Sequence, residues 1–193
     1  MAKVFFPSCK AVASYPEASK KLAAYLKDKY QIDPIGCCKV KGKMLNDDDQ
    51  AILVCLNCSR VLEGNQQEFI WNIIDQDDNF IFHDYHGIQM TLQDCHLANN
   101  KQEVKKAIRS LMKKMNIDIV ENEALNDHCP SYEIAGYHLK QKLTEEEKKA
   151  YFTNKYNKAT TDVIVSYCKY CNDGVLFSNK QGKHILELLF PIK

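Results

Sequence analysis

The sequence has no long hydrophobic run and no large excess of either charge, and these two absences exclude several classes of protein. Among its 193 residues, no stretch approaches the roughly 18 apolar residues of a membrane-spanning helix, and the apolar run in MAKVFFPSCK is too short for an export signal. We therefore expect no membrane insertion and a cytoplasmic protein. Lys plus Arg number 26 and Asp plus Glu number 25, which gives no electrostatic case for nucleic acid or an anionic membrane as a partner.

Glycine is also scarce. The chain has seven glycines, and no GxGxxG follows any of the strands that we expect. A loop that cradles nucleotide phosphates needs glycines at such positions, because only they let the backbone approach the phosphates closely. The sequence therefore gives no sign of a flavin or nicotinamide site, and any reducing equivalents must come from a partner.

Cysteine, in contrast, is abundant. The nine cysteines form two series, of which the first contains an adjacent pair and both end in a CxxC motif. The first series is Cys9, Cys37, Cys38, Cys55 and Cys58, and the second is Cys95, Cys129, Cys168 and Cys171. In a reducing compartment such cysteines are metal ligands or redox thiols more often than a disulfide framework.

Strands and helices alternate along the chain. Apolar runs at 2–7, 51–54, 87–94, 117–120 and 163–167 predict strands, while helical periodicity is found at 16–30, 66–76 and 101–115. Thr144 and Glu147 form a capping box, which predicts a further helix. Because strands that alternate with helices pair in parallel through right-handed crossovers, we expect an α/β fold.

The order of these elements is the same in both halves: strand, cysteine, helix, strand, loop cysteine, strand, CxxC and helix. This repeat predicts two tandem, pseudo-symmetric Rossmann-like lobes with mainly parallel sheets, at residues 1–86 and 87–193, which could also pack as one compact two-lobed domain. Open α/β sheets carry their sites at the carboxyl ends of the strands, and four cysteines occupy predicted strand ends. These four are Cys9, Cys55, Cys95 and Cys168.

Each cysteine series can therefore converge on one edge of its own sheet. Thiolates are the soft ligands that bind zinc or iron–sulfur clusters, and a CxxC supplies two of them from one turn. The five thiols of the first series exceed the four of a closed tetrahedral zinc site. This count favours a polynuclear cluster in the first lobe.

The order of a cysteine, an adjacent cysteine pair and a CxxC resembles the cysteine-rich CCG domain found in heterodisulfide reductase and in related iron–sulfur proteins of glycolate and lactate oxidation complexes. The resemblance implies that the first series binds a [4Fe–4S] cluster, which is non-cubane in that family. It also implies catalytic roles for Cys37 and Cys38. The protein would then be an oxidoreductase component that passes electrons from a flavoprotein or ferredoxin-like partner to a disulfide or other acceptor.

The second half has His128 and Cys129 where that family has the adjacent pair. We expect Cys95, Cys129, Cys168 and Cys171 to bind either zinc or an iron–sulfur cluster, and whether His128 is a ligand stays open. An alternative function is a zinc-binding, non-catalytic interaction module that kept the fold. Buried free cysteines and a thioredoxin-type dithiol are two further interpretations. The pattern does not indicate a substrate, an electron donor or an oligomeric state.

Overall fold

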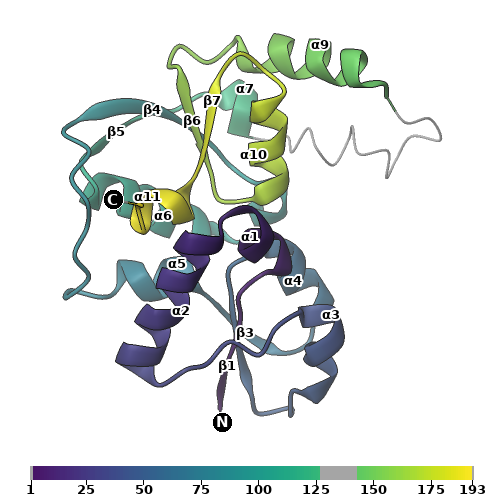
Figure 1. The fold of residues 1–193 in the computed structure, drawn as a ribbon, viewed down its shortest axis with the longest axis vertical. Helices are drawn as coiled ribbons and strands as arrows, with labels where there is room; N and C mark the ends of the chain where they lie inside the picture. Colours follow the sequence, from purple (N-terminus) through teal and green to yellow (C-terminus); the bar gives the residue numbers. More distant parts are fainter. Residues whose placement is uncertain (1, 127–142, 193) are drawn as a thin grey trace. The chain divides into compact units, whose positions relative to one another are not determined.

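The computed structural model describes residues 2–126 and 143–192 (Figure 1). The chain forms two compact units, of which the first comprises Met1–Ile81 with Leu189–Lys193 and the second comprises Phe82–Leu188. The expected halves, 1–86 and 87–193, differ from these units at the boundary and at the C-terminal segment. Each unit contains one parallel sheet.

The first unit has a three-stranded sheet in the order β1-β2-β3. Its elements are β1 (Lys3–Phe6), α1 (Cys9–Ser14), α2 (Pro16–Tyr30), α3 (Cys38–Lys41), the 3₁₀ helix η1 (Gly42–Met44), β2 (Gln50–Leu53), α4 (Leu56–Val61), β3 (Gln66–Phe69) and α5 (Ile70–Asp75). A single parallel bridge between Phe5 and Pro34 lies outside the named strands. The inner parts of β1 and β2 are buried and apolar, as parallel strands covered on both faces require.

The second unit has a four-stranded parallel sheet in the order β5-β4-β6-β7. Its elements are β4 (Ile88–Gln93), η2 (His96–Ala98), α6 (Gln102–Lys114), β5 (Ile117–Val120), α7 (Glu123–Asn126), α9 (Glu145–Tyr156), β6 (Val163–Ser166), α10 (Lys169–Leu176), β7 (Gln181–His184) and α11 (Ile185–Leu189), whose last residue belongs to the first unit. The capping box of Thr144 and Glu147 begins α9 as expected.

The two units repeat one topology. In the first, β1 pairs with β2 and β2 with β3; in the second, β4 pairs with β6 and β6 with β7. The bridge from β1 to Pro34 corresponds in topology to the pairing of β4 with β5 in the second unit. The prediction of two α/β lobes with parallel sheets and cysteines at the strand ends is confirmed.

Residues 66–76 do not form the single helix that their periodicity predicts. Gln66–Phe69 is strand β3, and helix α5 begins only at Ile70. The Gln67 amide fixes the strand, because its nitrogen donates to the carbonyl oxygens of Ser59 (3.0 Å) and Leu62 (2.7 Å) at the end of α4. Tertiary hydrogen bonds therefore override the helical pattern of this segment.

None of the helices in the described part of the chain is both long and apolar enough to span a membrane.

A buried carboxylate joins α2 of the first unit to the turn after α5. The side chain of Asp77 is 2% exposed and pairs with the Lys29 ammonium group. It also accepts hydrogen bonds from the Tyr25 hydroxyl (2.8 Å) and the Asn79 backbone amide (2.9 Å). Burial alone would raise the pKa of Asp77, but these interactions outweigh burial and lower it.

We predict that Asp77→Asn lowers the free energy of unfolding by about 2 kcal/mol at pH 7, because the variant loses charge-assisted hydrogen bonds. Since the folded pKa lies below the unfolded value of about 4, this stabilisation is present above that pH and is lost as the pH falls through the folded pKa. Urea unfolding at pH 7 and pH 3, with the exposed Asp47→Asn as control, measures both effects. Equal loss of stability on acidification in Asp77→Asn and the native protein would contradict the assignment.

Candidate metal centre

Three buried cysteines meet in the second unit. The sulfur atoms of Cys95, Cys168 and Cys171 all lie within 4.8 Å of one another, and each residue is at most 4% exposed. Within residues 2–126 and 143–192, no other set of three thiol, imidazole or carboxylate groups lies so close together. The sequence placed these three cysteines in one site, and a buried triad that could hold a metal ion is what the structure contains.

The parallel register of β4 and β6 brings the three cysteines together. Gln93 and Ser166 are paired and are the last residues of their strands. Each strand is followed by one residue and then by a cysteine, so Cys95 and Cys168 leave the sheet at the same edge. Cys171 follows in α10, because the CxxC spacing places the second thiol within the first turn of that helix.

The two residues directly before these cysteines hydrogen-bond to each other. The Tyr167 hydroxyl donates to Asp94 Oδ1 at 2.8 Å and accepts from the Cys95 backbone amide at 3.0 Å. One phenol therefore ties the backbone at Cys95 to the strand end that carries Cys168. Burial and the neighbouring Asp94 charge raise the pKa of Tyr167, so its hydroxyl keeps its proton and remains a donor.

Arg109 of α6 compensates the buried Asp94 charge. The Asp94 side chain is 2% exposed, and Arg109 Nη2 lies 2.8 Å from Asp94 Oδ2. Arg109 also binds Glu121 through Nε (2.6 Å) and Nη2 (2.9 Å). A buried carboxylate without such a partner would be strongly destabilising, so the guanidinium group is what allows Asp94 to stay beside Cys95.

Two further side chains support the CxxC segment. The Tyr156 hydroxyl donates to Gln93 Oε1 at 2.6 Å and lies 3.5 Å from the Cys171 carbonyl oxygen. His184, at the end of β7, accepts from the Leu186 amide through Nδ1 (3.2 Å) and hydrogen-bonds to the Tyr167 backbone. Burial lowers the pKa of His184 to about 4, so the imidazole is neutral at pH 7 and acts as a structural group.

The thiol hydrogen bonds of the triad converge on Cys168. The side chains of Cys171 and Cys95 hydrogen-bond to its sulfur and, with the backbone amides of Cys171 and Tyr170, hold the pKa of Cys168 below its ordinary value despite burial. Metal ligation requires thiolates, and this environment favours the first deprotonation. The triad is therefore suited chemically to a thiophilic metal ion.

The spacing of the sulfur atoms suits a single metal ion. Thiolates bound to one tetrahedral zinc at roughly 2.3 Å lie about 3.8 Å apart, which is compatible with three sulfurs within 4.8 Å of one another. The fourth ligand predicted from the sequence was Cys129, with His128 as its neighbour. Both residues lie outside the described part of the chain.

The first unit places its five cysteines at the starts of three helices. Cys9 is the first residue of α1, Cys37 and Cys38 begin α3, and Cys55 directly precedes α4, which contains Cys58. Their side chains interact pairwise: Cys9 with Cys37 and Cys38, Cys37 with Cys38, Cys38 with Cys58, and Cys58 with Cys55. The five thiols, which we call the row, are therefore linked by pairwise interactions, but no three of them lie within 4.8 Å of one another as the triad does.

The members of this row differ in exposure and acidity. Cys9 is exposed, Cys37 and Cys55 are half-buried, and Cys38 and Cys58 are buried. The backbone amides of Lys39 and Val40 at the start of α3 lower the pKa of Cys37, whereas desolvation and the neighbouring Cys37 raise that of Cys9. A hydrogen bond to Cys55, together with burial, raises the pKa of Cys58. Cys37 is therefore the most acidic thiol for which a shift is resolved in this row.

A strained residue precedes the first cysteine. Ser8 has φ 65° and ψ 109°, a region that residues with a Cβ rarely adopt, and it is 4% exposed. Its hydroxyl accepts from the Ala11 amide at 3.3 Å and caps α1. The strain turns the chain sharply from β1 into α1, so that Cys9 begins the helix instead of continuing the strand.

Sequence reasoning missed the residues that support the second site, namely Asp94, Arg109, Tyr156 and Tyr167. Two of them had a detectable signal, because Asp94 and Tyr167 each directly precede a cysteine at a strand end. A carboxylate at one position and a phenolic hydroxyl at the other indicate a hydrogen bond between the ends of the two parallel strands. Arg109 and Tyr156 lie far from the cysteines in sequence and carried no such signal.

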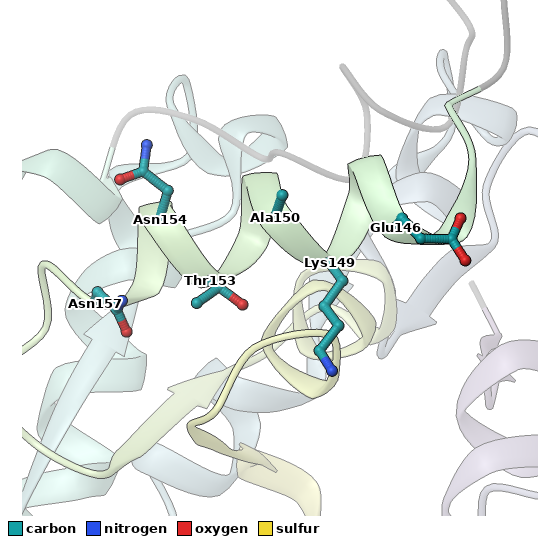
Figure 2. A pocket seen from close by; sticks show the side chains of 6 residues that line it. All are labelled: Glu146, Lys149, Ala150, Thr153, Asn154 and Asn157. Atoms are coloured by element: carbon teal, nitrogen blue, oxygen red, sulfur yellow. The ribbon is translucent and has the colours of Figure 1, made fainter.

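A hollow of about 490 Å³ lies along α9, a helix that contains no cysteine (Figure 2). The side chains that line it come from α9 and the residue after it: Glu146, Lys149, Ala150, Thr153, Asn154 and Asn157. Figure 2 shows them spaced along this one helix. They include no thiol or imidazole group, so the hollow adds nothing to the metal-binding chemistry.

Comparison with protein-family models and with curated proteins gives no match for this chain.

We predict that Tyr167→Phe weakens metal binding by the second unit by about 10- to 100-fold, because the hydroxyl that orients Cys95 is lost while the ring still fills its place. Competition with a zinc chelator on the purified protein measures this affinity. Tyr151→Phe, on the exposed side of α9, is the matched control. Unchanged affinity in Tyr167→Phe would show that the hydrogen bond does not position the ligands.

Proposed function

We propose that the protein is a metalloprotein with one cysteine-ligated centre in each unit, of which the first is an iron–sulfur redox centre and the second a structural zinc site. The observation that carries this proposal is the buried triad of Cys95, Cys168 and Cys171, with all sulfurs within 4.8 Å of one another. The first unit has cysteines at the equivalent strand ends of the same topology.

The second centre suits zinc because it is tight, buried and rigidly supported. Structural zinc sites are closed and tetrahedral, with four ligands of which most are cysteines. The three described thiols supply three ligands, and we propose Cys129 as the fourth. A site with ligands at most 4% exposed offers no access to a substrate, so its contribution is to hold the ends of β4 and β6 together.

The first centre suits a polynuclear cluster because five thiols are linked by pairwise interactions. One metal ion cannot take all five as ligands in tetrahedral geometry, whereas a cluster presents several metal ions to separate thiolates. We therefore propose that Cys9, Cys37, Cys38, Cys55 and Cys58 bind a [4Fe–4S] cluster of the non-cubane kind implied by the CCG resemblance. Such a cluster supplies reversible one-electron transfer when bound.

The chain's own residues define how this centre would work. Cys9 is exposed and Cys37 and Cys55 are half-buried, whereas Cys38 and Cys58 are buried. We propose that electrons enter from a flavoprotein or ferredoxin-like partner and leave to a disulfide or another acceptor, with Cys37 and Cys38 nearest the chemistry. The lowered pKa of Cys37 supports a thiolate at this position.

The eight described cysteines form no disulfide with one another. Free thiols in this number support a reducing compartment, and we propose the cytoplasm as the place of action.

The second candidate function is a zinc-binding interaction module without turnover. The geometry of the second centre favours it, because a tight triad needs no iron. The two functions differ in the metal of the first unit, which is iron in one case and zinc or none in the other.

Metal content after anaerobic purification separates the two functions. We predict brown protein with broad visible absorption, containing about four iron and about one zinc per chain. Elemental analysis, sulfide determination and electron paramagnetic resonance of the reduced protein provide the measurements. Colourless protein that contains only zinc would refute the redox function and support the interaction module.

We further predict that the two centres are independent. Cys38→Ser should remove the visible absorption and leave zinc bound, because Cys38 lies in the middle of the first row. Cys171→Ser should release zinc and retain the iron signal. Elemental analysis of both variants, purified anaerobically in parallel, tests this. Loss of both metals in either variant would contradict independent sites.

A further inference from the structure

The helical segments that begin at or next to the first-unit cysteines contain charged side chains of one sign, which is positive. These segments are α1, α3 with η1, and α4, with sequences CKAVAS, CKVKGKM and LNCSRV. They contain five basic residues and no acidic one. We call the five basic residues the basic rim: Lys10, Lys39, Lys41, Lys43 and Arg60. All five are exposed, in a chain whose formal net charge is only +1.

Among the described residues, no member of the basic rim forms an ion pair, although exposed Asp47, Asp48 and Glu63 follow two of the segments in sequence. Helix α10 of the second unit, which corresponds to α4 because both follow the first cysteine of a CxxC, differs in this respect. Its Lys169 pairs with Asp173 four residues later. The topological repeat thus serves as an internal comparison: the lysine at the start of α10 is paired, whereas the basic residues of α1, α3, η1 and α4 form no ion pair with the other described residues.

Exposed apolar side chains are interspersed with this charge. Val12, Val40, Met44 and Val61 are 42%, 66%, 67% and 45% exposed, and all four lie on the same helical segments. Large apolar groups are costly to leave in water, and in protein interfaces they form the contact core within a polar rim. Charge and apolar surface therefore occur together where Cys9 is exposed.

We propose that the basic rim, with these four apolar residues, is the docking surface for an acidic protein that delivers electrons to the first centre. The proposal rests on the proposed redox function for the role of the partner. Opposite charge steers two proteins into an encounter complex, and apolar contact then holds the redox centres close. The accessible Cys9 and Cys37 lie at the starts of two of the segments that form this surface.

Other anionic partners fit the surface less well. Single-stranded nucleic acid is bound by aromatic side chains that stack on bases, and the three segments contain no aromatic residue. An anionic membrane is bound by amphipathic helices much longer than α1, α3 and α4, which have 6, 4 and 6 residues. An acidic protein needs neither feature.

The test measures binding of the anaerobically purified full-length protein to two probes, an acidic plant-type [2Fe–2S] ferredoxin and an acidic flavodoxin. The dissociation constant is determined by calorimetry at several salt concentrations. We expect binding of at least one probe, with an affinity that falls steeply with salt. The variant Lys39→Glu/Lys41→Glu/Lys43→Glu should bind at least 10-fold more weakly and show a flatter salt dependence.

The matched control is Lys106→Glu/Lys113→Glu/Lys149→Glu, which changes the net charge equally at exposed lysines of α6 and α9. It should change the dissociation constant less than 2-fold. Equal weakening by both triple variants would overturn the proposal, as would native protein that binds neither probe. Stronger binding to phosphatidylserine vesicles or to single-stranded DNA, lost in the rim variant, would also overturn it.

Metal content and the absorption spectrum are recorded for every variant. If the glutamate variant loses its metal, the neutral Lys39→Gln/Lys41→Gln/Lys43→Gln replaces it and should bind at least 5-fold more weakly than native protein. Ferredoxin binding that depends on the rim in a protein without iron would contradict the redox function but leave the docking surface standing. Iron-containing protein that binds neither probe would contradict the docking surface alone.

Discussion

The parallel pairing of β4 with β6 is the interaction on which the second centre depends. It ends both strands at one edge, with Gln93 opposite Ser166, and so delivers Asp94 beside Tyr167 and Cys95 beside Cys168. The backbone ladder sets the register, and the bond from Tyr167 to Asp94 then holds the two segments after they leave the ladder. More than 70 residues of chain separate Cys95 from Cys168. Without this register, bringing the two cysteines together would cost the entropy of closing that loop.

The two units share a topology but not the residues that precede their cysteines. Where the second unit has Asp94 and Tyr167, the first has Ser8 and Val54. Serine and valine cannot form the phenol–carboxylate bond that links the two strand ends of the second unit. The first unit has one exposed thiol among its five, and the second has a buried triad.

The sequence predicts contacts between distant residues where these follow from the direction of the strands. Alternating strands and helices imply parallel sheets, and parallel sheets put the strand ends, and hence Cys95 and Cys168, at one edge. Segment 66–76 was misassigned because a short apolar run fits either a helix or a strand, and the deciding bonds from Gln67 come from another element. The Arg109 and Glu121 support was equally invisible, since it depends on how α6 packs on the sheet.

The two candidate centres differ in burial and in the charges around them. The thiols of the second unit are at most 4% exposed and are supported by paired charges, which hold them in place. Lys169 and Asp173 also pair nearby, so little net charge remains there to attract a partner. The first row has the opposite properties: one exposed thiol, an acidic half-buried neighbour and unpaired lysines on the same short helices. The exposed thiol of the first unit is more accessible to a partner than the buried triad is. In the function proposed above, one copy of the repeat stabilises the chain, and the other keeps one sulfur atom exposed for reaction.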